Sequence, residues 1–246
     1  MLSLHSMISI TSTLGRFLVV LFLVLLSGCG MPSLLITPVS SSTKLEESVV
    51  QDGKGSRKIA IIDLEGMLAN MKKGGFLSPT ENKLSLFVQE LDKAEKDDDV
   101  KAVVLRINSP GGTVSCTDAM YQLLKRFKEK THKPVIASTQ EVTASGGYYI
   151  SCAADKIVAR PTSIVGSIGV IFFTFDASGH MSKIGLRSEA IKSAPFKDIG
   201  SPFRPSTAEE RAIMQGIVDE YYARFKGVVT SNRDITDPAK LKILTD

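Results

Sequence analysis

The feature that most constrains the fold of this chain is a regular alternation of short apolar runs with amphipathic stretches. Apolar runs of strand length occupy residues 58–66, 100–108 and 134–139. Between them, residues 81–98 and 113–130 place apolar side chains at helical spacing. Strands that alternate with helices form βαβ units, whose strands run parallel in one sheet. The sequence therefore predicts an α/β protein with a largely parallel sheet, whose ligands bind beyond the carboxyl ends of the strands.

Shorter elements continue the pattern toward the carboxyl end. A helix is expected directly after the third strand, at residues 144–154, and a long last helix at residues 207–231. The N-cap of the last helix is expected at Ser206 or Thr207, with Glu209 or Glu210 behind it. Three further strands are expected, at residues 156–159, 170–174 and 186–191.

The N-terminal segment has the pattern of an export signal. Residues 17–26 form an unbroken apolar run, which is short for a spanning helix and fits the core of a signal peptide. The run ends in Leu-Ser-Gly-Cys29, which resembles the lipobox of bacterial lipoproteins and implies that Cys29 carries a lipid. Residues 1–29 are thus expected to be a signal peptide or an uncleaved membrane anchor. Residues 30–57, rich in small and polar residues, are expected to be a flexible tether to a domain outside the cytoplasm.

Composition excludes several classes of function. The net charge is +4 without dense basic clusters, and Trp is absent, so nucleic acid is not the expected partner. The three cysteines and three histidines fall in no zinc-binding spacing, and an odd cysteine count gives no disulfide framework. We therefore expect neither a metal nor a cofactor.

Two glycine-containing turns follow strands and have the features of a catalytic site. In TASGGYYIS, Ser145 precedes two glycines at the start of a helix, where developing negative charge is stabilised and the amide of Gly146 is unhindered. In SPGG, residues 109–112, two glycines allow backbone amides to converge on a charged oxygen. Taken singly, the first turn also fits a plain helix cap and the second an ordinary strand-to-helix turn.

Together these turns resemble a known family. RINSPGG, then ASGGYYISCAADKIVA, then GSIGV occur in the order found in the S49 family of signal peptide peptidases, which has a ClpP/crotonase-like fold. The resemblance covers residues 58–246 and implies a homo-oligomeric serine endopeptidase with a Ser-Lys dyad. Its implied substrates are hydrophobic peptides such as cleaved signal peptides, degraded at the extracytoplasmic face of the membrane.

The resemblance also assigns roles to residues. Ser145 is the implied nucleophile, and Lys197 in FKDIG is the implied general base, with Lys192 as the runner-up. Ser167 in GSIG is implied to orient the lysine, and Gly111, Gly112 and Gly146 to form the oxyanion site. In single-domain members of the family, the serine and the lysine can come from neighbouring subunits.

A lysine base must be neutral, although the ordinary lysine pKa is about 10.4. Burial against apolar side chains disfavours the charged form, and Pro195, Phe196 and Ile199 are the expected apolar neighbours of Lys197. Asp198 would oppose this effect if it faced the amine, so its carboxylate is expected to point elsewhere.

Two departures from the family pattern bear on function. Glu141-Val142-Thr143 precede the ASGG turn where small residues are common, and the sequence stops at Asp246, before a stretch that family members usually have. A truncated, non-catalytic lipoprotein scaffold is therefore one alternative. A ClpP-like peptidase that pairs Ser145 with His132 or His180, and a crotonase-like acyl-CoA enzyme, are the others.

Overall fold

The computed structural model describes residues 45–71, 82–233 and 235. The expected signal or anchor segment, with Cys29, and most of the expected tether lie outside these residues. The described part of the tether, residues 45–57, forms neither helix nor strand. It nevertheless contacts the folded domain, because the carbonyl of Leu45 accepts a hydrogen bond from Lys93 Nζ at 2.9 Å. None of the helices in the described part of the chain is long and apolar enough to cross a membrane.

A parallel sheet forms the centre of the folded domain. Three long strands, β1 (Lys58–Glu65), β2 (Val100–Ser109) and β3 (Val135–Ala144), pair side by side in chain order. Two short strands pair with opposite ends of β3: β4 (Lys156–Val158) near its start and β5 (Ile164–Gly166) at its end. All of these pairings are parallel, which confirms the predicted sheet.

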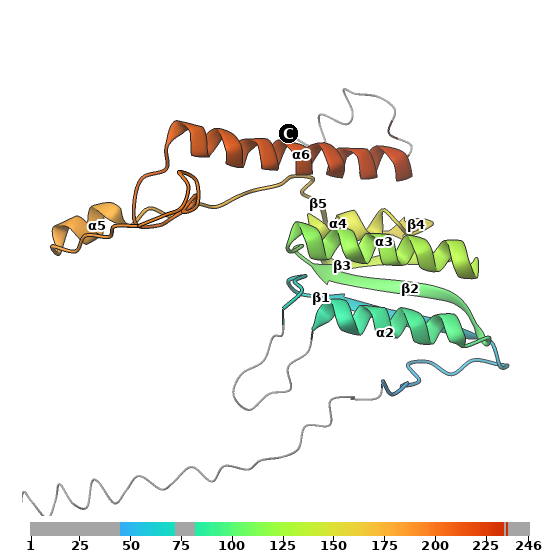
Figure 1. Ribbon diagram of the computed structural model, residues 1–246. Helices are drawn as coiled ribbons and strands as arrows, with labels where there is room; N and C mark the ends of the chain where they lie inside the picture. The colour runs from blue at the N-terminus through green and yellow to red at the C-terminus, as the bar shows by residue number, and fades with distance from the viewer. Residues whose placement is uncertain (1–44, 72–81, 234, 236–246) are drawn as a thin grey trace, which may run out of the picture. The chain divides into compact units, whose positions relative to one another are not determined.

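The helices α2 (Lys83–Lys96) and α3 (Val114–Thr131) are the crossovers between the long strands, and Figure 1 shows both running alongside them. Strand side chains alternate between two faces of a sheet. Those on the helix-covered face, such as Leu105, are fully buried with Phe87 of α2 and Leu124 of α3. This apolar layer is the core that holds the carboxyl ends of β1, β2 and β3 together.

The opposite face of the sheet is open within the described residues. Ile59 and Ile61 of β1 are exposed there, and so are polar side chains nearer the carboxyl ends of the strands. Among these, the Arg106 guanidinium binds both carboxylate oxygens of Asp63, at 2.5 and 2.6 Å.

Two expected strands are absent. Residues 170–174 and 186–191 form no strand, and between them lies a short helix that was not expected, α5 (Ser178–Lys183). Apart from Val170, their large apolar side chains are exposed; Phe173, for example, is 86% exposed. An apolar run becomes a buried strand only where a neighbouring strand and a covering layer are available, and the described chain supplies neither to this segment.

The last helix, α6 (Ala208–Asn232), begins at the expected cap. The side chain of Thr207 accepts a hydrogen bond from the Glu210 amide, and the Glu210 carboxylate accepts one from the Thr207 amide at 2.9 Å, forming a capping box. Only the C-terminal half of α6 packs on the sheet domain, where Phe225 and Val229 join the core cluster.

Candidate active site

Ser145 lies at the sharp junction between β3 and the short helix α4 (Gly146–Ser151). Its backbone has φ 50° and ψ −119°, and such strained conformations cost about 1–3 kcal/mol and persist only where the surroundings hold them. Here the Ser145 amide donates to the carbonyl of Gly166 on β5 at 2.8 Å. The Ser145 carbonyl accepts from the amide of Tyr149 at 2.9 Å. The side chain is half-buried, so the hydroxyl is held at the edge of the sheet and remains accessible.

The SPGG turn is fixed by a side chain that the sequence did not single out. The fully buried Ser109 hydroxyl donates to the Gly66 carbonyl at 2.7 Å and accepts from the Gly111 amide at 3.0 Å. Leu68 adds two backbone hydrogen bonds to the turn, one to the Gly111 carbonyl and one from the Thr113 amide, each 2.9 Å. The Gly111 amide is therefore already engaged in a hydrogen bond, and the four hydrogen bonds together make the turn rigid.

Gly111 keeps open the space between this turn and the nucleophile. A Cβ added at Gly111 would lie 2.6 Å from the Gly146 nitrogen and 3.1 Å from Ser145 Oγ, and its φ of +104° also favours glycine. A Cβ added at Gly146 would lie 3.2 Å from the Gly112 nitrogen. The amides of Gly112 and Gly146 thus lie close together beside Ser145.

Neither of these two amides donates to an acceptor within the described part of the chain. Preorganised donors of this kind stabilise the oxyanion that forms when a serine attacks a carbonyl. Three glycines were expected to form the oxyanion site. Gly112 and Gly146 supply amides that donate to no acceptor in the described part of the chain, and Gly111 lacks the Cβ that would fill the space beside Ser145 Oγ.

Ser167 follows β5 directly, and β5 pairs with the end of β3 through Ala144 and Gly166. The two serines therefore end neighbouring parallel strands. Ser167 also has a positive φ, 53°, and its side chain is exposed. Ser167 thus directly follows the residue whose carbonyl binds the Ser145 amide, and among the described residues no hydrogen bond joins it to either candidate lysine.

Ser145 lines a small pocket of about 30 Å³. The glycines of the two turns form one side of it, and α6 contributes Tyr221 and Phe225 from far along the chain. The remaining lining residues are Val114, Thr117, Tyr149, Gly169 and Val170. Sequence reasoning missed these residues, since no local pattern shows that α6 returns to the nucleophile.

A polar link holds α6 at this pocket. Asp118 of α3 accepts a hydrogen bond from the Tyr149 hydroxyl at 2.7 Å and forms an ion pair with Arg224 of α6 at 2.8 Å. Burial and the neighbouring Asp118 raise the pKa of Tyr149 well above its usual value, so the hydroxyl stays a donor. The aromatic ring of Tyr149 also packs against Phe225 with ring centroids 5.0 Å apart.

The two candidate lysines lie on the exposed segment before α6, and neither lines the pocket of Ser145. Lys192 is committed to an ion pair with Asp198 at 2.5 Å, whereas Lys197 is exposed and has no ion pair among the described residues. Arg204 also binds Asp198, at 2.7 and 2.8 Å, and it holds the pKa of that carboxyl far below its usual range. The Asp198 carboxylate thus binds Lys192 and Arg204, and among the described residues it forms no ion pair with Lys197.

The expected burial of Lys197 is not provided by this chain alone. Phe196 and Ile199, two of its three expected apolar neighbours, are themselves exposed. The described residues of one chain therefore do not supply the apolar surroundings that a neutral lysine requires.

The two histidines are poorly placed for a Ser-His mechanism. His132 caps the C-terminal end of α3, whose first turn follows the SPGG segment; an 18-residue helix is about 27 Å long. His180 is exposed on α5, and neither histidine lines the pocket of Ser145.

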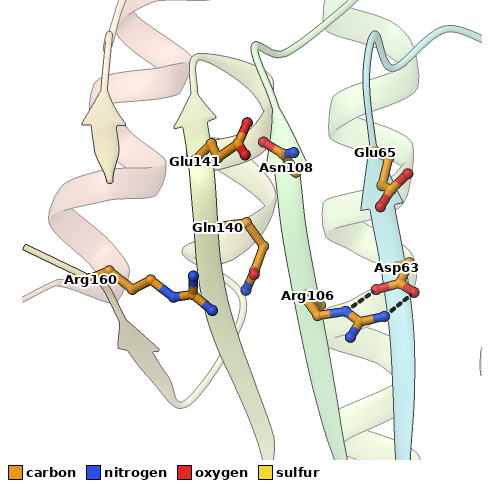
Figure 2. Close-up of a pocket in the computed structure, with 7 residues that line it drawn as sticks. All are labelled: Asp63, Glu65, Arg106, Asn108, Gln140, Glu141 and Arg160. Atoms are coloured by element: carbon orange, nitrogen blue, oxygen red, sulfur yellow. Dashed lines mark hydrogen bonds and ion pairs between the residues drawn. The ribbon is translucent and has the colours of Figure 1, made fainter. Parts of the chain in front are cut away.

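A larger polar pocket of about 210 Å³ lies on the open face of the sheet, and Figure 2 shows its side chains. Glu141 lines this pocket beside Asn108, and Glu65 and Arg160 border it from β1 and from the segment after β4. It shares no lining residue with the pocket of Ser145. The carboxylate that departs from the family pattern therefore faces the open side of the sheet.

Comparisons with known proteins agree with this arrangement. The family model described as Clp protease matches residues 63–165, and the model described as Peptidase family S49 matches residues 127–245. The chain is 37% identical over 228 residues to a protein named as a protease in Methanocaldococcus jannaschii, covering 92% of this chain and 70% of that protein. It is 32% identical to a protein named as signal peptide peptidase SppA in Enterococcus faecium, covering 83% of this chain and 59% of that protein. It is 35% identical to Protease 4 of Haemophilus influenzae, covering 73% of this chain and only 28% of that protein.

A parallel sheet of the Clp protease type, with a strained serine beside free backbone amides, defines the class of serine peptidases to which this protein belongs. Within that class, the chain is a member of peptidase family S49. The chain spans 70%, 59% and 28% of the lengths of the three relatives described.

Proposed function

We propose that the protein is a membrane-anchored endopeptidase in which Ser145 is the nucleophile and Lys197 the general base. The observation that carries this proposal is the geometry at Ser145. Its strained backbone presents a hydroxyl beside the amides of Gly112 and Gly146, neither of which donates to an acceptor among the described residues. The neutral amine of the lysine takes the Ser145 proton as the hydroxyl attacks a peptide carbonyl, and the two amides bind the resulting oxyanion.

The base is proposed to act from a neighbouring subunit of a homo-oligomer. Lys197 is exposed in the single chain, and the segment that carries it exposes many large apolar side chains. A second copy packed on this segment would bury both, and burial is what a lysine base needs. Lys192 is the weaker candidate, since its ammonium is paired with Asp198. Ser167, at the end of β5, would hydrogen-bond the incoming amine.

The proposed substrates are hydrophobic peptides such as cleaved signal peptides, degraded at the extracytoplasmic face of the membrane. One relative of this chain is named as a signal peptide peptidase, and the N-terminal apolar run with Cys29 fits a lipid or membrane anchor. The anchor would keep the domain close to peptides that remain in the bilayer.

The test is hydrolysis of a signal-peptide-like substrate by the wild type and by Ser145→Ala, Lys197→Met and Lys192→Met. Ser145→Ala should abolish both turnover and labelling by a fluorophosphonate probe, because no nucleophile remains. Lys197→Met should lower kcat about 10²- to 10⁴-fold, the usual contribution of a general base. Lys192→Met should keep substantial activity, and Lys183→Met, on α5 in the same exposed segment, is the matched control.

Two outcomes would contradict the proposal. Activity that survives Lys197→Met but not Lys192→Met would transfer the role of base to Lys192. A folded wild type that neither hydrolyses the substrate nor reacts with the probe would favour the non-catalytic scaffold.

A further inference from the structure

Tyr149 joins the helix that follows the nucleophile to the neighbouring helix. It is the fourth residue of α4 and is only 5% exposed, and its amide donates to the Ser145 carbonyl at 2.9 Å. Its hydroxyl donates to the Asp118 carboxylate of α3 at 2.7 Å. One side chain therefore connects the turn at Ser145 to a charged group on α3.

The two amides beside Ser145 come from separate segments of the chain. Gly112 lies just ahead of α3, and Gly146 is the first residue of α4. The distance between the two amides therefore depends on how α3 and α4 pack against each other. This packing is close beside Asp118, because a Cβ added at Gly146 would lie 2.5 Å from Oγ1 of the adjacent Thr117.

The Asp118 carboxylate is itself held in one orientation. Its Oδ1 accepts from the Tyr149 hydroxyl and from Arg224 Nε at 3.1 Å, and its Oδ2 accepts from Arg224 at 2.8 Å. The hydrophobic effect that packs two helices together is non-directional, whereas hydrogen bonds to a charged group are directional and comparatively strong. The hydrogen bonds of Asp118 therefore fix the relative position of α3 and α4 more sharply than apolar contacts do.

We propose that Asp118 is a positioning residue of the peptidase, which acts through the Tyr149 hydroxyl to hold the amides of Gly112 and Gly146 at the separation that the oxyanion requires. Asp118 does not line the pocket of Ser145, whereas Tyr149 does. The inference rests on Ser145 being the nucleophile. Oxyanion donors act on the transition state more than on the bound substrate, so loss of this positioning lowers kcat and leaves KM nearly unchanged.

The test measures kcat and KM of full-chain variants with a signal-peptide-like substrate. Tyr149→Phe keeps the ring and removes the hydroxyl, so kcat should fall by about ten-fold or more, part of what a missing oxyanion donor costs. Asp118→Ala should have the same effect. Asp118→Asn keeps an oxygen that accepts from the Tyr149 hydroxyl, so it should retain most of the activity. Tyr148→Phe, which removes a hydroxyl from the preceding residue of α4, is the matched control and should behave as the wild type.

A peptide aldehyde of the same sequence supplies a second readout. The aldehyde adds reversibly to the serine hydroxyl, and its oxygen then occupies the place of the oxyanion. Its inhibition constant should rise in Tyr149→Phe and Asp118→Ala in proportion to the loss of kcat/KM, because both quantities report on binding of the transition state. A loss of folded enzyme lowers the rate but leaves the inhibition constant unchanged, so this readout separates positioning from folding.

Three outcomes would overturn the proposal and leave the peptidase mechanism intact. These are a wild-type kcat in Tyr149→Phe, an inhibition constant that does not change when kcat falls, and an Asp118→Asn enzyme as impaired as Asp118→Ala. If instead Ser145→Ala cleaved the substrate as fast as the wild type, the nucleophile assignment would fail, and the role of Asp118 with it.

Discussion

At the scale of single residues, the site depends on backbone positions more than on side chains. Ser145 adopts a positive φ that a serine rarely takes, and Gly166 and Tyr149 hold it there by backbone hydrogen bonds. The buried Ser109 hydroxyl then aligns the SPGG turn opposite the nucleophile. The donors next to Ser145 are therefore fixed before any substrate arrives, which is the condition under which they stabilise a transition state most.

Gly111→Ala tests this arrangement. The new methyl group would lie 2.6 Å from the Gly146 nitrogen and occupy the space next to Ser145 Oγ. We expect kcat to fall by about 10²-fold or more, comparable to the loss of an oxyanion donor. Steady-state kinetics measure the effect, and circular dichroism and thermal unfolding check that the variant is folded.

Gly216→Ala is the matched control for that substitution. Gly216 lies inside α6, and nothing is within 4 Å of an added Cβ. Its activity should equal that of the wild type, and its stability should rise slightly because alanine is the better helix former. A folded Gly111→Ala enzyme with full activity would show that the oxyanion binds elsewhere.

At the scale of elements, α6 is joined to the rest of the chain by two charged links. In the C-terminal half of α6, Arg224 forms an ion pair with Asp118 of α3. At its N-terminus, Arg204 bridges Asp198 and the buried Glu210, so the segment that carries Lys197 is tied to the first turn of the helix. The position of the candidate base therefore depends on the start of α6.

The pH dependence of stability should report on the second link. Hydrogen bonds from Arg204, and one from the Thr207 amide, lower the pKa of Glu210 from 4.5 to about 2. Because this carboxyl is depressed in the folded state, its contribution to stability is complete above pH 4.5 and is lost as the pH falls toward 2. Glu210→Gln should therefore be less stable than the wild type at neutral pH and show a smaller decrease in melting temperature across this window.

Glu209→Gln, which changes an exposed carboxyl in the same turn, is the control and should follow the wild-type curve. Identical pH profiles for Glu210→Gln and the wild type would show that the Arg204 link contributes nothing to stability.

At the scale of the whole molecule, one segment of the described chain exposes an unusual amount of apolar surface. From residue 171 to residue 203, large apolar side chains are exposed at ten positions: Ile171, Phe172, Phe173, Phe175, Ile184, Leu186, Ile191, Phe196, Ile199 and Phe203. Exposed apolar side chains gathered in one segment are typical of an interaction surface. It supports the proposed homo-oligomer, in which Lys197 of one subunit serves Ser145 of the next.

Complementation tests that arrangement. Ser145→Ala and Lys197→Met are each expected to be inactive, yet their co-expression should restore about a quarter of wild-type activity if the dyad forms across a head-to-tail interface. In a random mixture, this is the fraction of sites with an intact serine on one side and an intact lysine on the other. Co-expression of Ser145→Ala with the Ser145→Ala/Lys197→Met double variant is the negative control, and activity that stays at background in both mixtures would place the dyad within one chain.

The sequence by itself determined the parallel sheet and the two glycine-containing turns beside Ser145. Apolar periodicity is local, so strands β1 and β2, helices α2 and α3 and the start of α6 at Thr207 were predicted within a few residues. The SPGG and ASGG turns were found for the same reason, because glycines that permit a special backbone can be read from neighbouring residues. The roles assigned to Ser145, Lys197 and Ser167 came from the family resemblance, and they remain proposals.

Only the tertiary structure decided the surroundings of Ser145. The strands expected at residues 170–174 and 186–191 were wrong, since an apolar run cannot show whether a neighbouring strand exists to pair with it. Likewise, no local pattern shows that Phe225 of α6 and Thr117 of α3 line the same pocket as Ser145. Burial and hydrogen bonding depend on residues far apart in the chain, so they are defined only when the chain has folded.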